Sequence, residues 1–248
     1  MNIEVGRSMG IMAMNMVANI PKFRLWPLLI GAVVVAGVIH LITLKHAKVK
    51  MANDAKEDAR KEKAENTSLL IVDAQNDFID GAVACENSME AIDNILKYIK
   101  ANPEIKTFYT ANEHPENYIG FTINGGNEPV HVVKDTDGAE IFLSFKNLEN
   151  PKQRAVEENT YYKGTKENTK EYSALGAINR KGDPLNEMLR SNVVLCGFVS
   201  EECIKETAMT LVESGYKVEL LSDGLGYKTF DSHIDTILDL ENLGVRLI

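Results

Sequence analysis

The chain has 248 residues, of which 44% are apolar and 25% are charged, the balance of an ordinary globular protein with ample material for a core. Its net charge of −9 is uneven, because residues 1–50 hold six of the 27 Lys and Arg but only one of the 36 Asp and Glu. The remainder is strongly acidic and has no Lys/Arg cluster to contact phosphates, which argues against a nucleic-acid partner. Three cysteines without C-x-x-C spacing predict neither a disulfide framework nor a zinc knuckle, and a reducing compartment is the simpler assumption.

Residues 25–44, LWPLLIGAVVVAGVIHLITL, form an almost unbroken apolar run. As a helix, such a run spans about 30 Å, the thickness of the hydrocarbon core of a bilayer. It is apolar on all sides, unlike an amphipathic core helix, and no small-x-small cleavage site follows it, which disfavours a signal peptide. We therefore predict a single transmembrane helix over 25–44, preceded by an N-terminal segment, 1–24, without a usable motif.

The two flanks of this helix differ in charge. More Lys and Arg lie near its C-terminal end than before its N-terminal end, so the positive-inside rule places the C-terminal part of the chain in the cytoplasm. Residues 45–66 are predicted to be a charged linker. Within it, 51–66 lack an apolar stripe and contain Glu57 and Lys61 at i,i+4 spacing, which favours a solvated helical stalk.

From residue 67 to 248, short β-branched runs alternate with helical periods, which indicates one α/β domain. The predicted strands are 68–73, 106–111, 160–162, 192–197, 217–222 and 245–248. The predicted helices are 88–101, 184–191, 201–214 and 229–243. Continuously apolar strands separated by helices predict a doubly wound parallel sheet, whose ligands bind at the carboxyl ends of the strands.

Three residues with reactive side chains lie at that edge of the predicted sheet. Asp73 ends the first strand, Lys163 follows the third, and Cys203 lies in the first turn of the helix after the fourth. Free N–H groups at the start of the helix favour a thiolate, so we expect a lowered pKa for Cys203. Asp73 could take the thiol proton and return it to a leaving amine. Taken singly, each residue has an ordinary structural interpretation: Asp73 as a turn residue, Lys163 as a surface charge and Cys203 as a small buried hydrophobe.

Residues 68–248 resemble the nicotinamidase branch of the isochorismatase-like hydrolases at five separated places. These are LLIVDAQNDF at 69–78, NEHPENYIGF at 112–121, PVHVVKDTDGAEI at 129–141, YYKG at 161–164 with Tyr172–Ser173, and VVLCGFVSEECIKETAMTLVESGYKVELLSD at 193–223. The resemblance assigns the family's catalytic Asp, Lys and Cys to Asp73, Lys163 and Cys203. It implies a six-stranded parallel sheet with helices on both faces, often assembled into homo-oligomers.

The resemblance also implies features around the nucleophile. Isochorismatases lack the nucleophilic cysteine, so Cys203 indicates amide hydrolysis through a thioester. The family's non-proline cis peptide would lie at Val199–Ser200. The N–H groups of Ser200 and Cys203 would then form the oxyanion hole.

A divalent metal, Zn, Fe or Mn, is implied too, held by Asn112, His114 and His131. Asn112 stands where the family has an aspartate and brings no negative charge; the ordinary alternative is that both histidines are plain polar residues. A second departure is Glu128, at a position where the family commonly has a tryptophan that stacks on the substrate ring. Phe78 and Tyr172 remain as candidate aromatic walls of a substrate site.

The expected function is hydrolysis of nicotinamide to nicotinate and ammonia, in the salvage of NAD, with metal-bound water resolving the thioester. A second hypothesis keeps the chemistry but takes another small amide, such as a carbamoyl or ureido compound, because Asn112 and Glu128 alter the ring site. A third is a membrane-tethered binding protein that retains the fold without turnover.

Overall fold

The structure, a computed structural model, describes residues 26–248. The chain divides into two units, one ending at Ala59 and one comprising Arg60–Ile248. The predicted N-terminal segment 1–24, and the first residue of the predicted transmembrane helix, lie outside the described residues.

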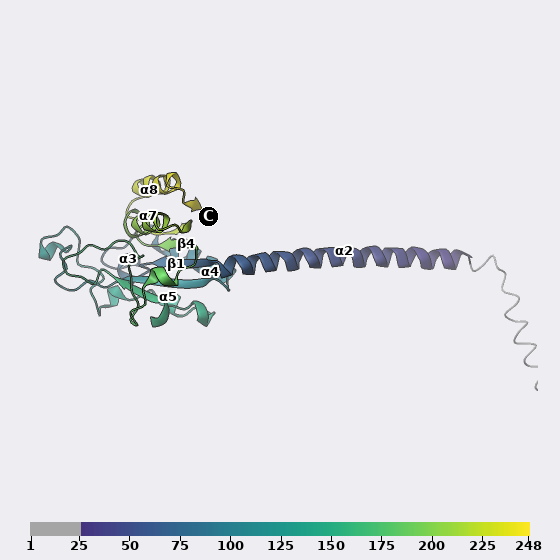
Figure 1. Cartoon of the computed structure of the whole chain (residues 1–248), viewed down its shortest axis with the longest axis horizontal. Helices are drawn as coiled ribbons and strands as arrows, with labels where there is room; N and C mark the ends of the chain where they lie inside the picture. Colours follow the sequence, from purple (N-terminus) through teal and green to yellow (C-terminus); the bar gives the residue numbers. More distant parts are fainter. Residues whose placement is uncertain (1–25) are drawn as a thin grey trace, which may run out of the picture. The chain divides into compact units, whose positions relative to one another are not determined.

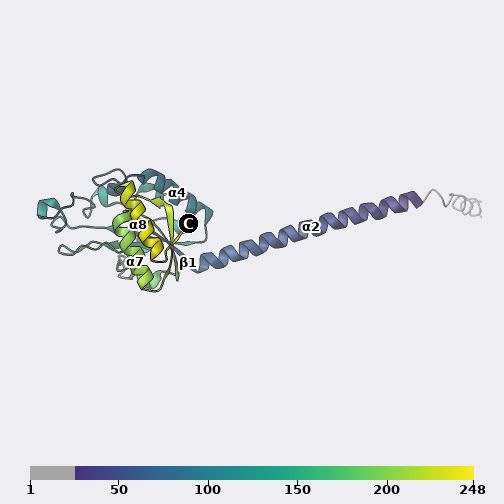
Figure 2. The same cartoon turned by 90° about the horizontal axis from the view of Figure 1, so that it is seen from above.

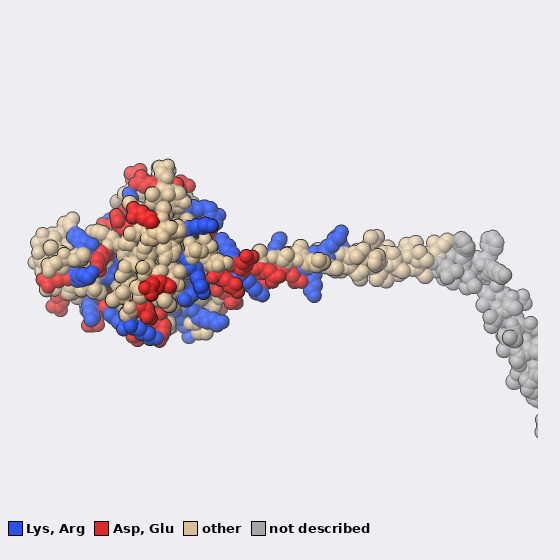
Figure 3. All heavy atoms as spheres, in the orientation of Figure 1, with Lys and Arg blue, Asp and Glu red and all other residues tan. Residues whose placement is uncertain are grey.

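Helix α2 (Trp26–Glu65) runs without a break from the apolar segment into the charged linker. Its residues from Ile30 to Lys63 are exposed, and Val33 and Leu41 leave 71% and 66% of their surface uncovered. Figure 3 shows an uncharged surface along the first part of the helix and mixed charges along the second. The helix is long and apolar enough to cross a membrane.

The second unit is built on a six-stranded sheet in which every strand runs parallel to its neighbours. The strands are β1 (Thr67–Val72), β2 (Lys106–Asn112), β3 (Thr160–Lys163), β4 (Asn192–Gly197), β5 (Lys217–Leu225) and β6 (Arg246–Leu247). Their order is β3-β2-β1-β4-β5-β6, which confirms the predicted doubly wound fold. All six residues of β1 are buried, as expected for a central strand covered on both faces.

Helices cover both faces of the sheet (Figures 1 and 2). Helix α4 (Ser88–Ala101) buries Ile92, Ile95 and Ile99, a stripe at helical spacing, in the apolar core on one face. Helices α7 (Lys205–Glu213) and α8 (Phe230–Asn242) cover the other face, where Leu211 and Leu240 belong to a second core.

Two helices differ in extent from the predicted ones. The predicted helix 184–191 is only the short α6 (Leu185–Met188), because the chain turns back to β1, where the Arg190 N–H donates to Ser68 Oγ at 2.9 Å. The predicted helix 201–214 begins as a π-helical turn, η6 (Ser200–Ile204), before α7. Short helices fill the segment after β1 and the long connection from β2 to β3: α3 (Asn76–Ile79), η2 (Thr122–Asn124), η3 (Asp137–Ala139), α5 (Leu143–Lys146), η4 (Pro151–Gln153) and η5 (Glu157–Asn159).

The strand order sets the place of the site. The chain adds β2 and β3 on one side of β1, and β4, β5 and β6 on the other, so its direction reverses between β1 and β4. Loops leaving the carboxyl ends of β1 and β4 diverge at this point, which is where doubly wound folds bind ligands.

Position 197, at the end of β4, requires a glycine because the backbone there passes very close to Val72 at the end of β1. The φ of Gly197 is +119°, and a Cβ there would lie 2.1 Å from the Val72 carbonyl oxygen. Gly182 also has a positive φ, +88°, but a Cβ there would meet nothing within 4 Å. We predict that Gly197→Ala lowers the free energy of unfolding by more than about 3 kcal/mol. The matched Gly182→Ala should cost only about 1–2 kcal/mol, the price of a left-handed residue with a Cβ.

Chemical denaturation of the full chain measures both losses. Equal losses in the two variants would show that contact with β1 does not constrain Gly197.

Candidate active site

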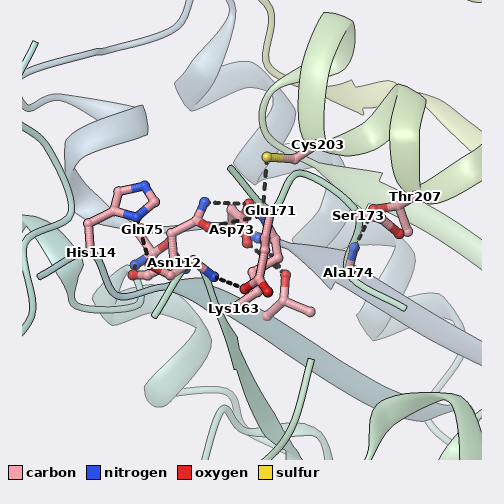
Figure 4. A network of polar contacts seen from close by, with 12 residues as sticks. Asp73, Gln75, Asn112, His114, Lys163, Glu171, Ser173, Ala174, Cys203 and Thr207 are labelled. Carbon is pink, nitrogen blue, oxygen red and sulfur yellow. Dashed lines mark hydrogen bonds and ion pairs between the residues drawn. The ribbon is translucent and has the colours of Figure 1, made fainter. Parts of the chain in front are cut away.

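The structure brings Asp73, Lys163 and Cys203 together at the carboxyl edge of the sheet (Figure 4). Lys163 Nζ lies 2.7 Å from Asp73 Oδ2 and 3.2 Å from Cys203 Sγ. All three residues are buried, with exposed fractions of 0%, 2% and 4% in chain order. A lysine this buried is rare unless it is paired, so the ordinary reading of Lys163 as a surface charge is wrong.

Asp73 is held by the neighbouring strand. Its φ of +50° is uncommon for a residue with a Cβ, and such a conformation costs about 1–3 kcal/mol. Two contacts with Thr110 in β2 fix it: the Asp73 N–H donates to the Thr110 carbonyl at 3.1 Å, and Thr110 Oγ1 donates to Asp73 Oδ1 at 2.7 Å. Sequence reasoning missed Thr110, whose role depends on the pairing of β1 with β2.

Asn112, at the end of β2, joins the two charged groups. Its Nδ2 donates to Asp73 Oδ2 at 2.9 Å, and its Oδ1 accepts a hydrogen bond from Lys163 Nζ at 3.1 Å. The Gln75 side chain holds the backbone of Asn112 from both sides, with contacts of 2.8 and 2.7 Å. Gln75 was also missed, although it follows Asp73 by two residues within a block that carries the family resemblance.

The electrostatics of the site differ from the prediction. Burial raises the pKa of the Cys203 thiol to about 12; Lys163 opposes this shift and Asp73 adds to it. The expected lowering by the helix start is therefore wrong, because desolvation outweighs the favourable charges. Burial alone would lower the pKa of Lys163, but Asp73 and Cys203 outweigh it and raise that pKa. The Cys203 thiol is therefore neutral at rest, beside the ion pair of Lys163 and Asp73.

The loop before Cys203 corrects two further predictions. The cis peptide bond lies at Phe198–Val199, one residue before the predicted place. The Ser200 N–H donates to the Gly226 carbonyl at 2.9 Å, so it is not free to stabilise an oxyanion. Its hydroxyl pairs with His233 Nδ1 at 2.8 Å. Within the part of the chain that the structure describes, the N–H of Val199 donates to no backbone carbonyl, and Val199 lines the cavity beside Cys203.

A cavity of about 150 Å³ opens onto Cys203. Phe78 and Tyr172, the predicted aromatic walls, both line it. Glu128 lines it as well, and its carboxylate accepts from Lys170 Nζ at 2.6 Å and from the Tyr172 hydroxyl at 3.3 Å. The position where the family commonly has a tryptophan is therefore a polar, ion-paired wall.

The predicted metal ligands come together only in part. His114 and His131 line the same cavity with ring centroids 5.3 Å apart, and each Nδ1 lies 2.8 Å from a backbone carbonyl oxygen, of Gly164 and Pro129 respectively. This arrangement orients imidazoles that bind metals through Nε2. Two histidines alone do not make a metal site, however. Among residues 26–248, no group of three or more His, Cys, Asp or Glu side chains could hold an ion.

Asn112 does not complete the set. Both polar atoms of its amide are engaged, by Asp73 and by the Lys163 ammonium. A divalent ion on the same oxygen would lie next to that ammonium in a buried site, where like charges repel strongly. The residues present therefore do not fit the predicted three-ligand metal site.

Known proteins share the family and the fold of this chain. The isochorismatase domain model matches residues 67–248. The chain belongs to this family, on its nicotinamidase branch. With the buried Cys–Lys–Asp centre, this membership identifies the chain as a cysteine hydrolase that acts on amide bonds.

Three similar proteins each align with about three quarters of the chain. The nicotinamidase/pyrazinamidase of Mycobacterium tuberculosis is 24% identical over 73% of this chain and 97% of its own. A probable inactive nicotinamidase of Arabidopsis thaliana is 27% identical over 75% of this chain and 93% of its own. The crystal structure of the Pyrococcus horikoshii pyrazinamidase in complex with zinc has a TM-score of 0.62 and 26% identity, and covers 74% of this chain and 98% of its own.

The raised pKa of Cys203 gives a pH prediction. Only the thiolate reacts with iodoacetamide, so the rate of Cys203 alkylation should be low at neutral pH and still rise above pH 9, the ordinary value for the thiol. Peptide mass spectrometry resolves Cys203 from Cys85 and Cys196. A rate that levels off below pH 7 would show instead that Lys163 stabilises a resting thiolate.

Proposed function

We propose that the domain hydrolyses a small carboxamide to the acid and ammonia, with Cys203 as nucleophile, and that nicotinamide is the reference substrate. The observation that carries the proposal is the position of Lys163 Nζ, 2.7 Å from the Asp73 carboxylate and 3.2 Å from the Cys203 sulfur. The names of the relatives in Mycobacterium tuberculosis and Pyrococcus horikoshii support a carboxamide on an aromatic ring.

In the first half-reaction, Asp73 accepts the Cys203 proton as the sulfur attacks the amide carbon. Lys163, held charged by its neighbours, stabilises the negative charge on the sulfur as the proton leaves. The C–N bond then breaks, Asp73 returns the proton to the departing amine, and ammonia leaves behind a thioester on Cys203.

In the second half-reaction, Asp73 is again a carboxylate and takes a proton from water, which attacks the thioester carbon. The C–S bond breaks, the acid leaves, and Asp73 passes the proton taken from water to the sulfur, which restores the Cys203 thiol. The N–H groups of Val199 and Cys203, rather than that of Ser200, are assigned to the oxyanion, since the Ser200 N–H is already bonded. No step passes through a metal.

A second candidate substrate is a carbamoyl or ureido compound, favoured by the state of His114. Its Nδ1 faces the Gly164 carbonyl oxygen, which only accepts, and burial lowers its pKa to about 4, so the ring is neutral with its proton on Nδ1. The free Nε2 is then a hydrogen-bond acceptor. A ureido N–H can donate to it, whereas a pyridine nitrogen, itself an acceptor, cannot.

Ammonia release from purified full-length chain tests the proposal, with nicotinamide, pyrazinamide and ureido compounds as substrates. Cys203→Ala should lower kcat by about 10³-fold or more, as loss of a nucleophile does. Cys196→Ala is the matched control, because Cys196 is a buried thiol in β4 outside the cavity. Undiminished release by Cys203→Ala would refute the mechanism, and no release from any amide by the wild type would favour a binding protein.

The proposal includes anchoring of the domain through residues 25–44 as a single membrane span, with the domain in the cytoplasm. The exposed apolar side chains of α2 from Ile30 onward support it. The full chain should stay with membranes after alkaline carbonate extraction, and Val34→Lys with Val38→Lys should release it, since each central charge costs about 2.5–3.5 kcal/mol. The matched control is Ala52→Lys with Ala55→Lys, two substitutions in the charged part of α2 that should leave the chain with the membranes. Retention of both variants would contradict the span.

A further inference from the structure

Asn112 occupies a buried position between the two charged residues of the site. It is paired in register with Lys163 across β2 and β3, and only 4% of its surface is exposed. Its backbone is fixed by Gln75, so the side chain leaves the sheet edge from a rigid base. A residue held in this way acts through its side-chain amide alone.

The orientation of that amide is determined by its partners. Nδ2 lies 2.9 Å from Asp73 Oδ2, which can only accept, and Oδ1 lies 3.1 Å from the Lys163 ammonium, which can only donate. A flipped amide would set donor against donor and acceptor against acceptor. The Asn112 amide therefore links the Asp73 carboxylate to the Lys163 ammonium, and each of its two hydrogen bonds is to a charged group.

An aspartate at this position would have the opposite effect. Its second oxygen would face Asp73 Oδ2 without a proton between them, two carboxylates in a buried site that also holds a single ammonium. Such a site needs a further cation to balance its charge. With asparagine, Asp73 and Lys163 balance each other, and the thiol is neutral.

We infer that Asn112 is a positioning residue that fixes Asp73 and Lys163 around Cys203, and that the centre assembles without a divalent ion at the position implied by the family resemblance. Only its kinetic consequence rests on the proposed function. The assembly itself follows from contacts among groups that the chain supplies: one carboxylate, one ammonium, one amide and one thiol.

The first test uses zinc and needs no substrate. Zinc should leave the melting temperature of the wild-type full chain unchanged, and the purified protein should hold well below one ion per chain. Asn112→Asp should create a zinc-dependent rise in melting temperature, because a carboxylate then joins His114 and His131. Adding His131→Ala to that variant should remove the rise. One tightly held ion per wild-type chain that is lost in Asn112→Ala would overturn the inference.

The second test measures how Asn112 affects the thiol. Alkylation of Cys203 by iodoacetamide at fixed pH should be about tenfold slower in Asn112→Ala, because Lys163 is no longer held against the sulfur. Asn147→Ala, at an exposed site outside the cavity, is the control. An unchanged rate in a variant that melts cooperatively would contradict the positioning role. If Asn112→Ala does not fold, the zinc measurements on the wild type and Asn112→Asp decide.

The two proposals can fail separately. A chain that hydrolyses no tested amide fails the proposed function, yet its zinc response and alkylation rate still report on Asn112. A chain that hydrolyses amides but loses activity to a chelator fails this inference alone.

Discussion

The Lys163–Asp73 ion pair constrains the rest of the site. Both charges are removed from water, and desolvation of such groups costs several kcal/mol per ion unless hydrogen bonds and the partner charge compensate. Thr110 and Asn112 supply those hydrogen bonds to the carboxylate, and Asn112 accepts one from the ammonium. Lys163 also contacts the Cys203 sulfur, so the ammonium that balances the Asp73 carboxylate lies against the thiol as well.

The strand order explains how residues far apart in the chain meet. The sheet places the ends of β1, β2, β3 and β4 side by side, and each contributes one polar side chain to the site: Asp73 after β1, Asn112 in β2, Lys163 in β3 and Cys203 after β4. The strand ends carry the buried polar centre, whereas the loops carry His114, Glu128 and Tyr172, which line the cavity beside it.

Sequence reasoning placed Asp73, Lys163 and Cys203 at one edge because strand ends in a parallel sheet must converge there. It could not give the pKa of Cys203, which depends on how completely the thiol is buried. It assigned Asn112 to a metal site, because the two partners that engage its amide, Asp73 and Lys163, come from other strands and cannot be read from spacing. The oxyanion prediction for Ser200 failed because its N–H is bonded to Gly226, in a loop that sequence spacing does not connect to it.

The central claim is that Asp73 and Lys163 act as one buried, compensated unit, and a double-mutant cycle on the free energy of unfolding tests it most directly. Lys163→Met and Asp73→Asn should each destabilise the chain by about 3–5 kcal/mol, since each leaves its partner buried without an opposite charge. The double variant should cost less than the two together, by about 0.5–3 kcal/mol of coupling. Additive losses would contradict the account, because they would mean that the two side chains do not interact in the folded protein.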